Sequence, residues 1–100
     1  MYIINNTISF APQIEKDAIS WIKSTYIPLL ESCPIVTQTF FAKVHSNIED
    51  AQLNYVIQTF FANEKDYTTF CEKYKNDFAQ ALLLKLGNNF GVFTTVLEKL

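Results

Sequence analysis

His45 is the only histidine in the chain, and an imidazole is the side chain whose ordinary pKa best suits proton transfer near neutral pH. Lys43 precedes it by two positions, and Asn54 follows it across a short polar stretch. One interpretation is a general base at the end of a strand, with an ammonium group and an amide beside it. The other is a histidine without a chemical role, which is favoured because no serine or cysteine nucleophile is visibly paired with it. No catalytic residue is predicted.

A second set of side chains has the composition of a ligand-binding cavity. Uncharged amides and hydroxyls alternate with phenylalanines along several extended segments, a mixture that suits a small, partly apolar ligand. Trp21 and Tyr26, on a predicted helix, either line the entrance of such a cavity or pack in the core or an interface, and packing is favoured. For the residues on the extended segments, packing between subunits that leaves no cavity is an equally open interpretation. The predicted binding residues are Asn5, Trp21, Tyr26, Thr39, Phe41, Lys43, His45, Asn54, Gln58 and Phe60.

Neither a metal site nor a cofactor site is predicted. A single histidine offers no ligand cluster, and Cys33 and Cys71 lack the C-x-x-C spacing of zinc and redox sites. We expect both cysteines to be reduced thiols that serve as small apolar side chains.

The charge balance argues against several classes of function. The net charge is −2, and the chain contains lysine but no arginine. Arginine makes the bidentate contacts to phosphate that nucleic-acid sites use, and a basic stripe is also missing, so neither nucleic acid nor an anionic membrane is an expected partner. No apolar run reaches the roughly 18 residues of a membrane span, and the N-terminus lacks a signal-peptide pattern. A cytoplasmic protein is expected.

Four segments have the composition or alternation of β-strands. In Tyr2–Phe10, Ile4 and Ile8 share an apolar side with Asn6, which would need a bulge or a buried hydrogen bond there. The two middle segments carry the same five letters, QTFFA, at 38–42 and 58–62, and form a predicted hairpin around a polar connection at 46–51. The predicted strands are Tyr2–Phe10, 35–45, 52–62 and 90–97.

Two amphipathic helices are predicted between these strands. The first begins at Pro12, and Pro28 should end or kink it near 24–27. The second begins after Asn63, which is a good N-cap residue, and stops at Gly87 in a left-handed conformation. Their apolar stripes recur at three- and four-residue steps. The predicted stripes are Ile14, Ala18, Trp21, Ile22, Thr25 and Leu29, and then Tyr67, Phe70, Cys71, Tyr74, Phe78, Ala81, Leu82 and Lys85.

The resulting order, β-α-β-β-α-β, is that of the ferredoxin-like fold, an α+β class. Right-handed crossovers then give a four-stranded antiparallel sheet with both helices on one face. One hundred residues suffice for one domain with a modest core, so residues 1–100 are expected to form a single ferredoxin-like domain.

The predicted strands carry almost no charge, since Lys43 is the only charged residue on them. A sheet face open to water normally carries charged residues at alternate positions, and two helices can cover only one face. With Gln38 paired near Thr59, the uncovered face would be a mixture of amides, hydroxyls and phenylalanines. The simplest cover for it is a second copy of the chain, sheet on sheet, in a two-fold dimer. The predicted face is Asn5, Thr7, Thr39, Phe41, Lys43, His45, Asn54, Val56, Gln58, Phe60 and Thr94.

Short motifs spread over the whole chain resemble a small bacterial family of uncharacterised proteins. They are the opening MYIINNTI, the W-x-x-x-x-Y-I-P segment at 21–28 and the closing FTTVL at 93–97. The resemblance implies membership of the dimeric α/β-barrel superfamily, in which ferredoxin-like protomers pair their sheets into a shared barrel. Members of that family often have histidine at the position of Tyr26. The family has no established activity, and superfamily relatives include cofactorless monooxygenases, isomerising enzymes and ligand-binding regulatory domains.

We therefore expect a non-enzymatic homodimer that binds a small molecule or a protein partner through the space between its sheets. The alternative is a cofactorless enzyme of the monooxygenase or isomerase type that uses the polar barrel interior.

Overall fold

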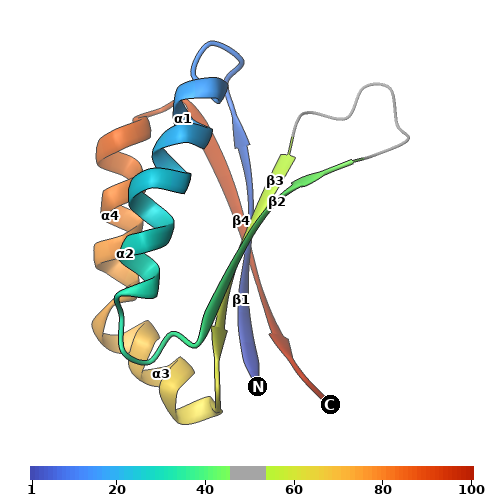
Figure 1. The fold of residues 1–100 in the computed structure, drawn as a ribbon, viewed down its shortest axis with the longest axis vertical. Helices are drawn as coiled ribbons and strands as arrows, with labels where there is room; N and C mark the ends of the chain where they lie inside the picture. The colour runs from blue at the N-terminus through green and yellow to red at the C-terminus, as the bar shows by residue number, and fades with distance from the viewer. Residues whose placement is uncertain (46–53) are drawn as a thin grey trace.

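The computed structural model describes residues 1–45 and 54–100. Their elements follow the order β-α-β-β-α-β, which confirms the predicted ferredoxin-like fold (Figure 1). The predicted connection at 46–51 lies outside the described residues. The strands are β1 (Tyr2–Phe10), β2 (Gln38–Val44), β3 (Asn54–Phe61) and β4 (Phe90–Glu98).

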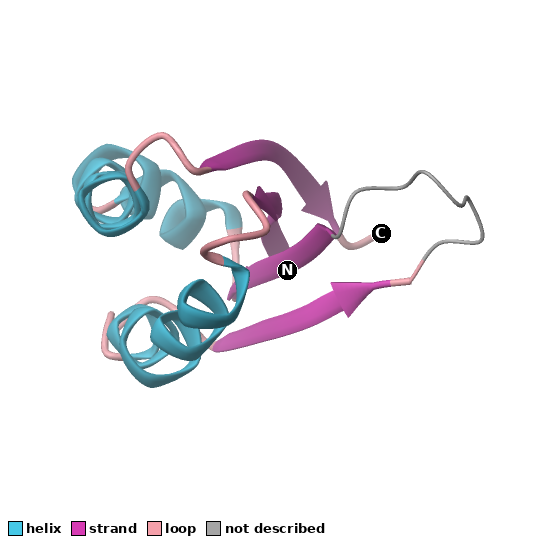
Figure 2. Ribbon diagram, turned by 90° about the horizontal axis from the view of Figure 1, so that it is seen from above, coloured by secondary structure: helices cyan, strands magenta, loops and turns pink. Residues whose placement is uncertain are grey.

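The described strands form one sheet in the order β2-β3-β1-β4, and all neighbours are antiparallel. Viewed from above, the helices form one layer and the strands another, so only one side of the sheet is covered (Figure 2). We call the covered side the helix side and the other side the open face. From the strand registers, the open face consists of Ile3, Asn5, Thr7, Ser9, Gln38, Phe40, Ala42, Val44, Asn54, Val56, Gln58, Phe60, Gly91, Phe93, Thr95 and Leu97.

β1 has the predicted alternation. Ile4, Ile8 and Phe10 are buried on the helix side. Asn6 lies among them without a bulge, because the pairing of β1 with β4 runs without interruption. Its Oδ1 atom instead accepts a hydrogen bond of 2.7 Å from the Thr94 hydroxyl on β4. Asn6 is therefore accommodated by a hydrogen bond and not by a bulge.

The predicted register of β2 is wrong by one residue. Gln38 pairs with Phe60, not near Thr59, and Phe41 pairs with Ile57. The backbone N–H and the hydroxyl of Thr37 both donate to the Phe60 carbonyl, at 2.9 and 3.2 Å, and these bonds fix where the pairing starts. Because strand side chains alternate, the slip moves every β2 side chain to the other face.

Pro28 was predicted to end or kink the first helix near 24–27; the helix does not end there, and an irregular turn lies directly before Pro28. The first helical segment comprises α1 (Glu15–Trp21), the π-helical turn η1 (Ile22–Tyr26) and α2 (Ile27–Glu31). Proline has no N–H, and its ring clashes with a carbonyl of the preceding turn in a regular helix. The wider turn directly before Pro28, closed by the Ile27 N–H on the Ile22 carbonyl, lets the helix go on.

The wide turn also changes which residues of this segment face the sheet. Thr25 and Leu29, expected on the apolar stripe, are exposed. The buried side chains instead recur at steps of four residues, because a π-turn contains more residues than an α-turn. They are Ala18, Ile22, Tyr26 and Leu30.

The second helical segment consists of α3 (Glu64–Lys73) and α4 (Lys75–Leu86). The predicted cap is confirmed, since the Asn63 side chain accepts a hydrogen bond of 2.8 Å from the Asp66 N–H. Lys85, placed on the predicted stripe, is exposed. The stop at Gly87 is also confirmed, with φ of 59° and ψ of −132°, a positive φ outside the left-handed helical region.

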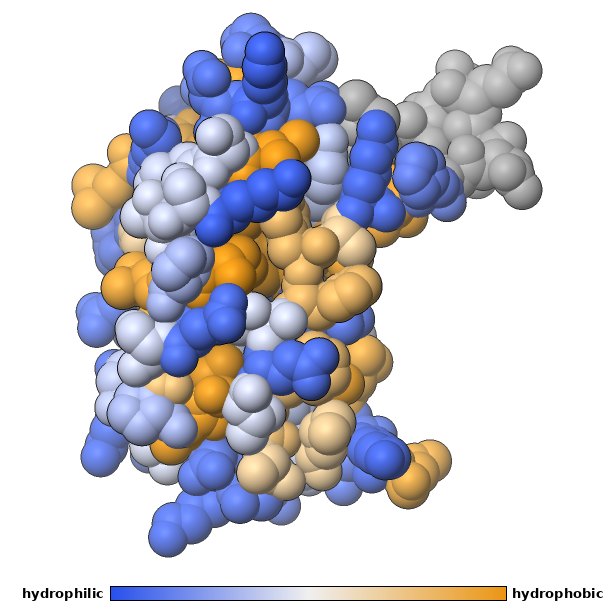
Figure 3. Space-filling model, viewed as in Figure 1, coloured by the Kyte–Doolittle hydropathy of each residue, from blue (hydrophilic) through white to orange (hydrophobic). Residues whose placement is uncertain are grey.

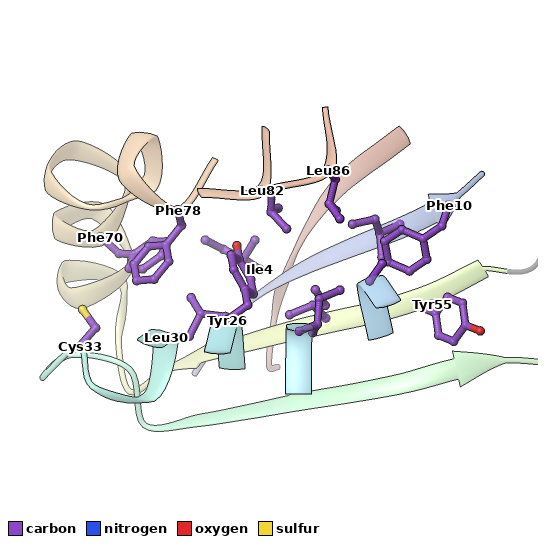
Figure 4. Close-up of a cluster of buried hydrophobic side chains, with 14 of the residues drawn as sticks. Ile4, Phe10, Tyr26, Leu30, Cys33, Tyr55, Phe70, Phe78, Leu82 and Leu86 are labelled. Atoms are coloured by element: carbon purple, nitrogen blue, oxygen red, sulfur yellow. The ribbon is translucent and has the colours of Figure 1, made fainter. Parts of the chain in front are cut away.

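The core lies between the helices and the two inner strands (Figure 4). Aromatic rings connect its layers: Phe70 lies 5.0 Å from Phe61 of β3 and 5.5 Å from Phe78 of α4, measured between ring centroids. Tyr26 meets Phe78 edge to face at 6.0 Å. Cys33 is buried in this core and Cys71 is partly buried, both as free thiols, as predicted.

Gly87→Ala should destabilise the fold although there is room for the added methyl group. A Cβ atom there would meet nothing within 4 Å, so the cost is conformational and is expected to be about 1–3 kcal/mol. Gly91→Ala is the matched control, since its Cβ would lie an acceptable 3.4 Å from the Ser9 hydroxyl oxygen. Urea unfolding should show a clear loss for the first variant and little change for the second. Equal losses of unfolding free energy in the two variants would contradict the claim that the cost arises from the backbone conformation of Gly87.

Candidate functional site

The structure divides the residues predicted to bind a ligand between two sides of the sheet. Asn5, Asn54, Gln58 and Phe60 lie on the open face, as expected. The Gln58 amide donates a hydrogen bond of 3.0 Å to the Asn5 side-chain oxygen, which joins the two inner strands across this face. This part of the predicted set forms one surface.

Thr39, Phe41 and Lys43 do not belong to that surface. The β2 register places them on the helix side, where Phe41 packs 5.9 Å from the Tyr55 ring. Thr94 was also expected on the open face and instead faces Asn6 on the helix side. His45 follows the end of β2 and is exposed.

Trp21 and Tyr26 also lie on the helix side. Their rings are 5.6 Å apart, and Tyr26 is only 3% exposed. Burial raises the pKa of Tyr26 to about 12. The hydroxyl makes no hydrogen bond to the described residues, and since none of their buried side-chain oxygens lacks a partner, its oxygen atom keeps contact with solvent at the edge of the buried ring.

A cavity of about 270 Å³ lies beside Tyr26, between α4 and the β1–β4 half of the sheet. It exists because the helices cover β4 incompletely: Val92 and Val96 on its helix side are 49% and 44% exposed. In Figure 4 the hydroxyl end of Tyr26 is directed toward Phe78 and Leu82 of α4, beside Ile4. The lining residues are Ile4, Asn6, Tyr26, Leu30, Thr59, Phe70, Lys75, Phe78, Ala79, Leu82, Leu83, Phe90, Val92 and Thr94.

The walls of this cavity are mostly apolar and carry a few polar groups. The Thr94 hydroxyl is already committed to Asn6. Tyr26 and Thr59 are both almost completely buried and contribute hydroxyls. Lys75, the first residue of α4, is exposed and supplies the one charged side chain of the described lining. A concave apolar site with a few convergent polar groups is the usual form of a small-molecule site.

The sequence contained a signal for this cavity, but it did not predict that the residues involved lie together. Asn6, Thr59 and Thr94 each occupy a helix-side position in a strand whose neighbours on that side are apolar. The Asn6 irregularity was visible in the sequence. The three positions come together only through the strand order, with β1 between β3 and β4.

A second cavity, of about 400 Å³, lies where the β1–α1 and α4–β4 connections meet. Glu15 lines it and accepts a hydrogen bond of 2.7 Å from the Tyr55 hydroxyl. Burial, with this bond to a carboxylate as a further cause, raises the pKa of Tyr55 to about 12. The pair joins α1 to β3.

Among the described strand residues, those on the open face carry no charge, because Lys43 lies on the other side. Several of its large apolar side chains are exposed: Phe93 by 70%, Phe40 by 49% and Leu97 by 41%. In Figure 3 hydrophobic colour gathers along the middle of the right-hand margin, the side away from the helices. An uncharged, partly apolar surface of this kind marks an interaction site.

Two further classes of site find no support in the described part of the chain. Residues 1–45 and 54–100 hold no group of three or more His, Cys, Asp or Glu side chains able to bind a metal ion. None of the described helices combines the length and the apolarity needed to cross a bilayer.

The family model described as "Domain of unknown function (DUF4286)" matches residues 1–100. The chain belongs to this family. The resemblance expected from the short motifs is thereby confirmed. No curated protein matches the chain.

Solved structures show how widely the DUF4286 fold is shared. An ethyl tert-butyl ether d (ethd) family protein from Bacillus halodurans C-125 matches with a TM-score of 0.77 and 9% identity over 100% of both chains. HapK from Hahella chejuensis matches with a TM-score of 0.70 and 17% identity over 100% of this chain and 93% of that one. A dimeric ferredoxin-like protein from an uncultured marine organism matches with a TM-score of 0.62 and 10% identity over 96% of this chain and 92% of that one. Identities this low establish a likeness of fold alone.

The buried phenol of Tyr26 predicts a loss of stability at high pH. The folded-state pKa of about 12 exceeds the ordinary 10, so the contribution to stability is fully present below pH 10 and is lost as the pH rises toward 12. Tyr26→Phe cannot ionise and should lose less stability between pH 9 and pH 11.5, by about 2 kcal/mol. Urea unfolding at pH 9 and pH 11.5 measures the difference.

Tyr55→Phe serves as a comparison, because it also removes a phenol with a raised pKa but additionally breaks a hydrogen bond to Glu15. It should cost about 1 kcal/mol already at pH 7, whereas Tyr26→Phe loses no protein hydrogen bond there. If the wild type and Tyr26→Phe lose the same stability between pH 9 and pH 11.5, ionisation of Tyr26 is not the cause of the loss.

Proposed function

We propose that the protein is a homodimer that binds one small molecule per protomer in the cavity beside Tyr26. The observation that carries the binding function is an apolar cavity of about 270 Å³ whose wall includes the hydroxyls of Tyr26 and Thr59. A ligand acceptor could take a hydrogen bond from the Tyr26 hydroxyl in place of solvent. The cavity is slightly smaller than the roughly 300–1,000 Å³ typical of drug-sized ligands, so a small ligand is proposed.

The open face, where the ligand site was expected from the sequence, becomes the contact between protomers in this proposal. Its lack of charge and its exposed phenylalanines suit a surface that a second identical face covers. The amide pair Gln58–Asn5 at its centre would contribute polar contacts between the sheets. A dimeric ferredoxin-like structure of similar fold supports this arrangement.

Binding without catalysis is the better-supported form of the proposal. Among the described residues that line the cavity there is no carboxylate and no imidazole that could act as a general base. His45, the sequence-based candidate, is not among them. The polar groups present are suited to hold and orient a ligand.

The dimer is tested by a charge on the open face. Phe93→Glu should raise the dimer dissociation constant at least about 100-fold, because each dimer would bury two unpaired carboxylates. Leu84→Glu is the matched control, since Leu84 is 84% exposed on α4. Sedimentation velocity should show twice the 11.5 kDa chain mass for the wild type and the control, and the chain mass for Phe93→Glu. A wild-type monomer at micromolar concentration ends the dimer proposal.

The binding site is tested by narrowing the cavity. Ala79 is exposed on α4 and lines the cavity, whereas the adjacent Gln80 is exposed and does not. Saturation-transfer NMR with a panel of one- and two-ring fragments should reveal binders to the wild type. Ala79→Phe should lower the affinity of these fragments by about tenfold or more, since a ring at this position takes up ligand space. Gln80→Phe should leave their affinity unchanged. Binders that ignore Ala79→Phe would place the site elsewhere.

A further inference from the structure

We infer that the ligand is a small apolar carboxylate that carries a second hydrogen-bond acceptor at the end buried in the cavity. This inference rests on the proposed binding function and names the chemical class of its ligand. It follows from three properties of the described cavity walls: their apolar bulk, the kind of polar group they offer, and the placement of the single charge.

The walls select an apolar, flat or chain-like body. Phe70 and Phe78 stack on one another at 5.5 Å with an interplanar angle of 17°, and Leu82 and Leu30 add aliphatic surface. A fully polar ligand would leave these side chains in contact with groups that need water. Transfer of a ring or alkyl body from water onto this surface would supply most of the affinity.

The polar groups of the interior are mainly hydroxyls. Tyr26 and Thr59 each contribute one, and the Tyr26 hydroxyl has no partner among the described residues. The acceptor capacity of Asn6 is partly used, because its side-chain oxygen already receives the Thr94 proton. A ligand that enters is therefore met by O–H groups, and an acceptor at its buried end, such as a hydroxyl or keto oxygen, would take a hydrogen bond from them.

The only charge in the described lining is positive and lies at the rim. Lys75 is exposed at the first position of α4, and no carboxylate lines the cavity to neutralise it. A carboxylate at the outer end of the ligand would remain hydrated and pair with this ammonium group. The arrangement places a donor at the buried end and a cation at the mouth, which defines the polarity of the ligand from one end to the other.

Three compounds with the same two-ring body test the two ends separately: 6-hydroxy-2-naphthoate, its neutral amide 6-hydroxy-2-naphthamide, and 2-naphthoate, which lacks the hydroxyl. Isothermal titration at pH 7 with the full chain should show that 6-hydroxy-2-naphthoate binds about two- to fivefold more tightly than the amide. It should also bind about two- to tenfold more tightly than 2-naphthoate.

Single substitutions should remove each preference alone. Lys75→Gln should abolish the preference for the acid over the amide, and Lys85→Gln, the same charge change on α4 away from the cavity lining, should retain it. Tyr26→Phe should abolish the preference for the hydroxylated acid over 2-naphthoate while keeping the acid–amide preference. Unchanged melting temperatures without ligand show that each variant is folded.

The outcomes separate this inference from the proposed function. If the wild type binds acid and amide equally and Ala79→Phe still weakens both, the carboxylate class is overturned and the cavity remains the site. If Lys75→Gln still binds the acid more tightly than the amide, Lys75 does not pair with the ligand carboxylate. Binding of none of the three compounds at millimolar concentration, together with no Ala79-sensitive fragment, overturns the proposed function itself.

Discussion

The two helical segments bury the helix side of β1 and β3 and leave two parts of the sheet uncovered. One is the whole open face, and the other is the helix side of β4 beyond Phe90. Which residues lie on each of these two surfaces follows from the alternation of side chains along a strand. The proposed ligand cavity lies at one of these two surfaces, and the proposed dimer contact is the other. The amount of sheet that the helices can cover is therefore the constraint on which both proposals depend.

Polar residues in the covered layer are tolerated here because strand pairing places them next to one another. Asn6 and Thr94 are directly opposite on β1 and β4 and satisfy each other with one hydrogen bond. Thr59 lies opposite Ile4 on the neighbouring strand and faces the same cavity. An apolar core residue at any of these positions would pack more simply. Their presence beside the Tyr26 hydroxyl gives the cavity the few polar groups on which the proposed binding function depends.

The sequence was sufficient for the order of elements, the alternation of β1 and the limits of the second helical segment, because periodicity and capping are local properties. It was not sufficient for the face of β2. There the letters QTFFA contain two adjacent phenylalanines, so either register buries one of them, and the choice depends on Thr37 bonding to Phe60. The slip removed Thr39, Phe41 and Lys43 from the predicted site. The cavity itself could not be predicted, because it arises where α4 stops short of covering β4.

The repeated QTFFA has the same orientation in both strands once the observed pairing is known, with Thr39 opposite Thr59 and each glutamine on the open face. The π-turn at Ile22–Tyr26 is a different kind of feature, because it works as a one-residue insertion within a helix. Deleting one residue of that turn would return the segment to a regular α-helix in which Tyr26 and Leu30 follow Ile22 by three and seven residues. Positions at these steps share one face of an α-helix, so Tyr26 and Leu30 would still face the sheet together with Ala18. In any pairwise alignment of such chains, a single-residue gap here is therefore compatible with an unchanged core.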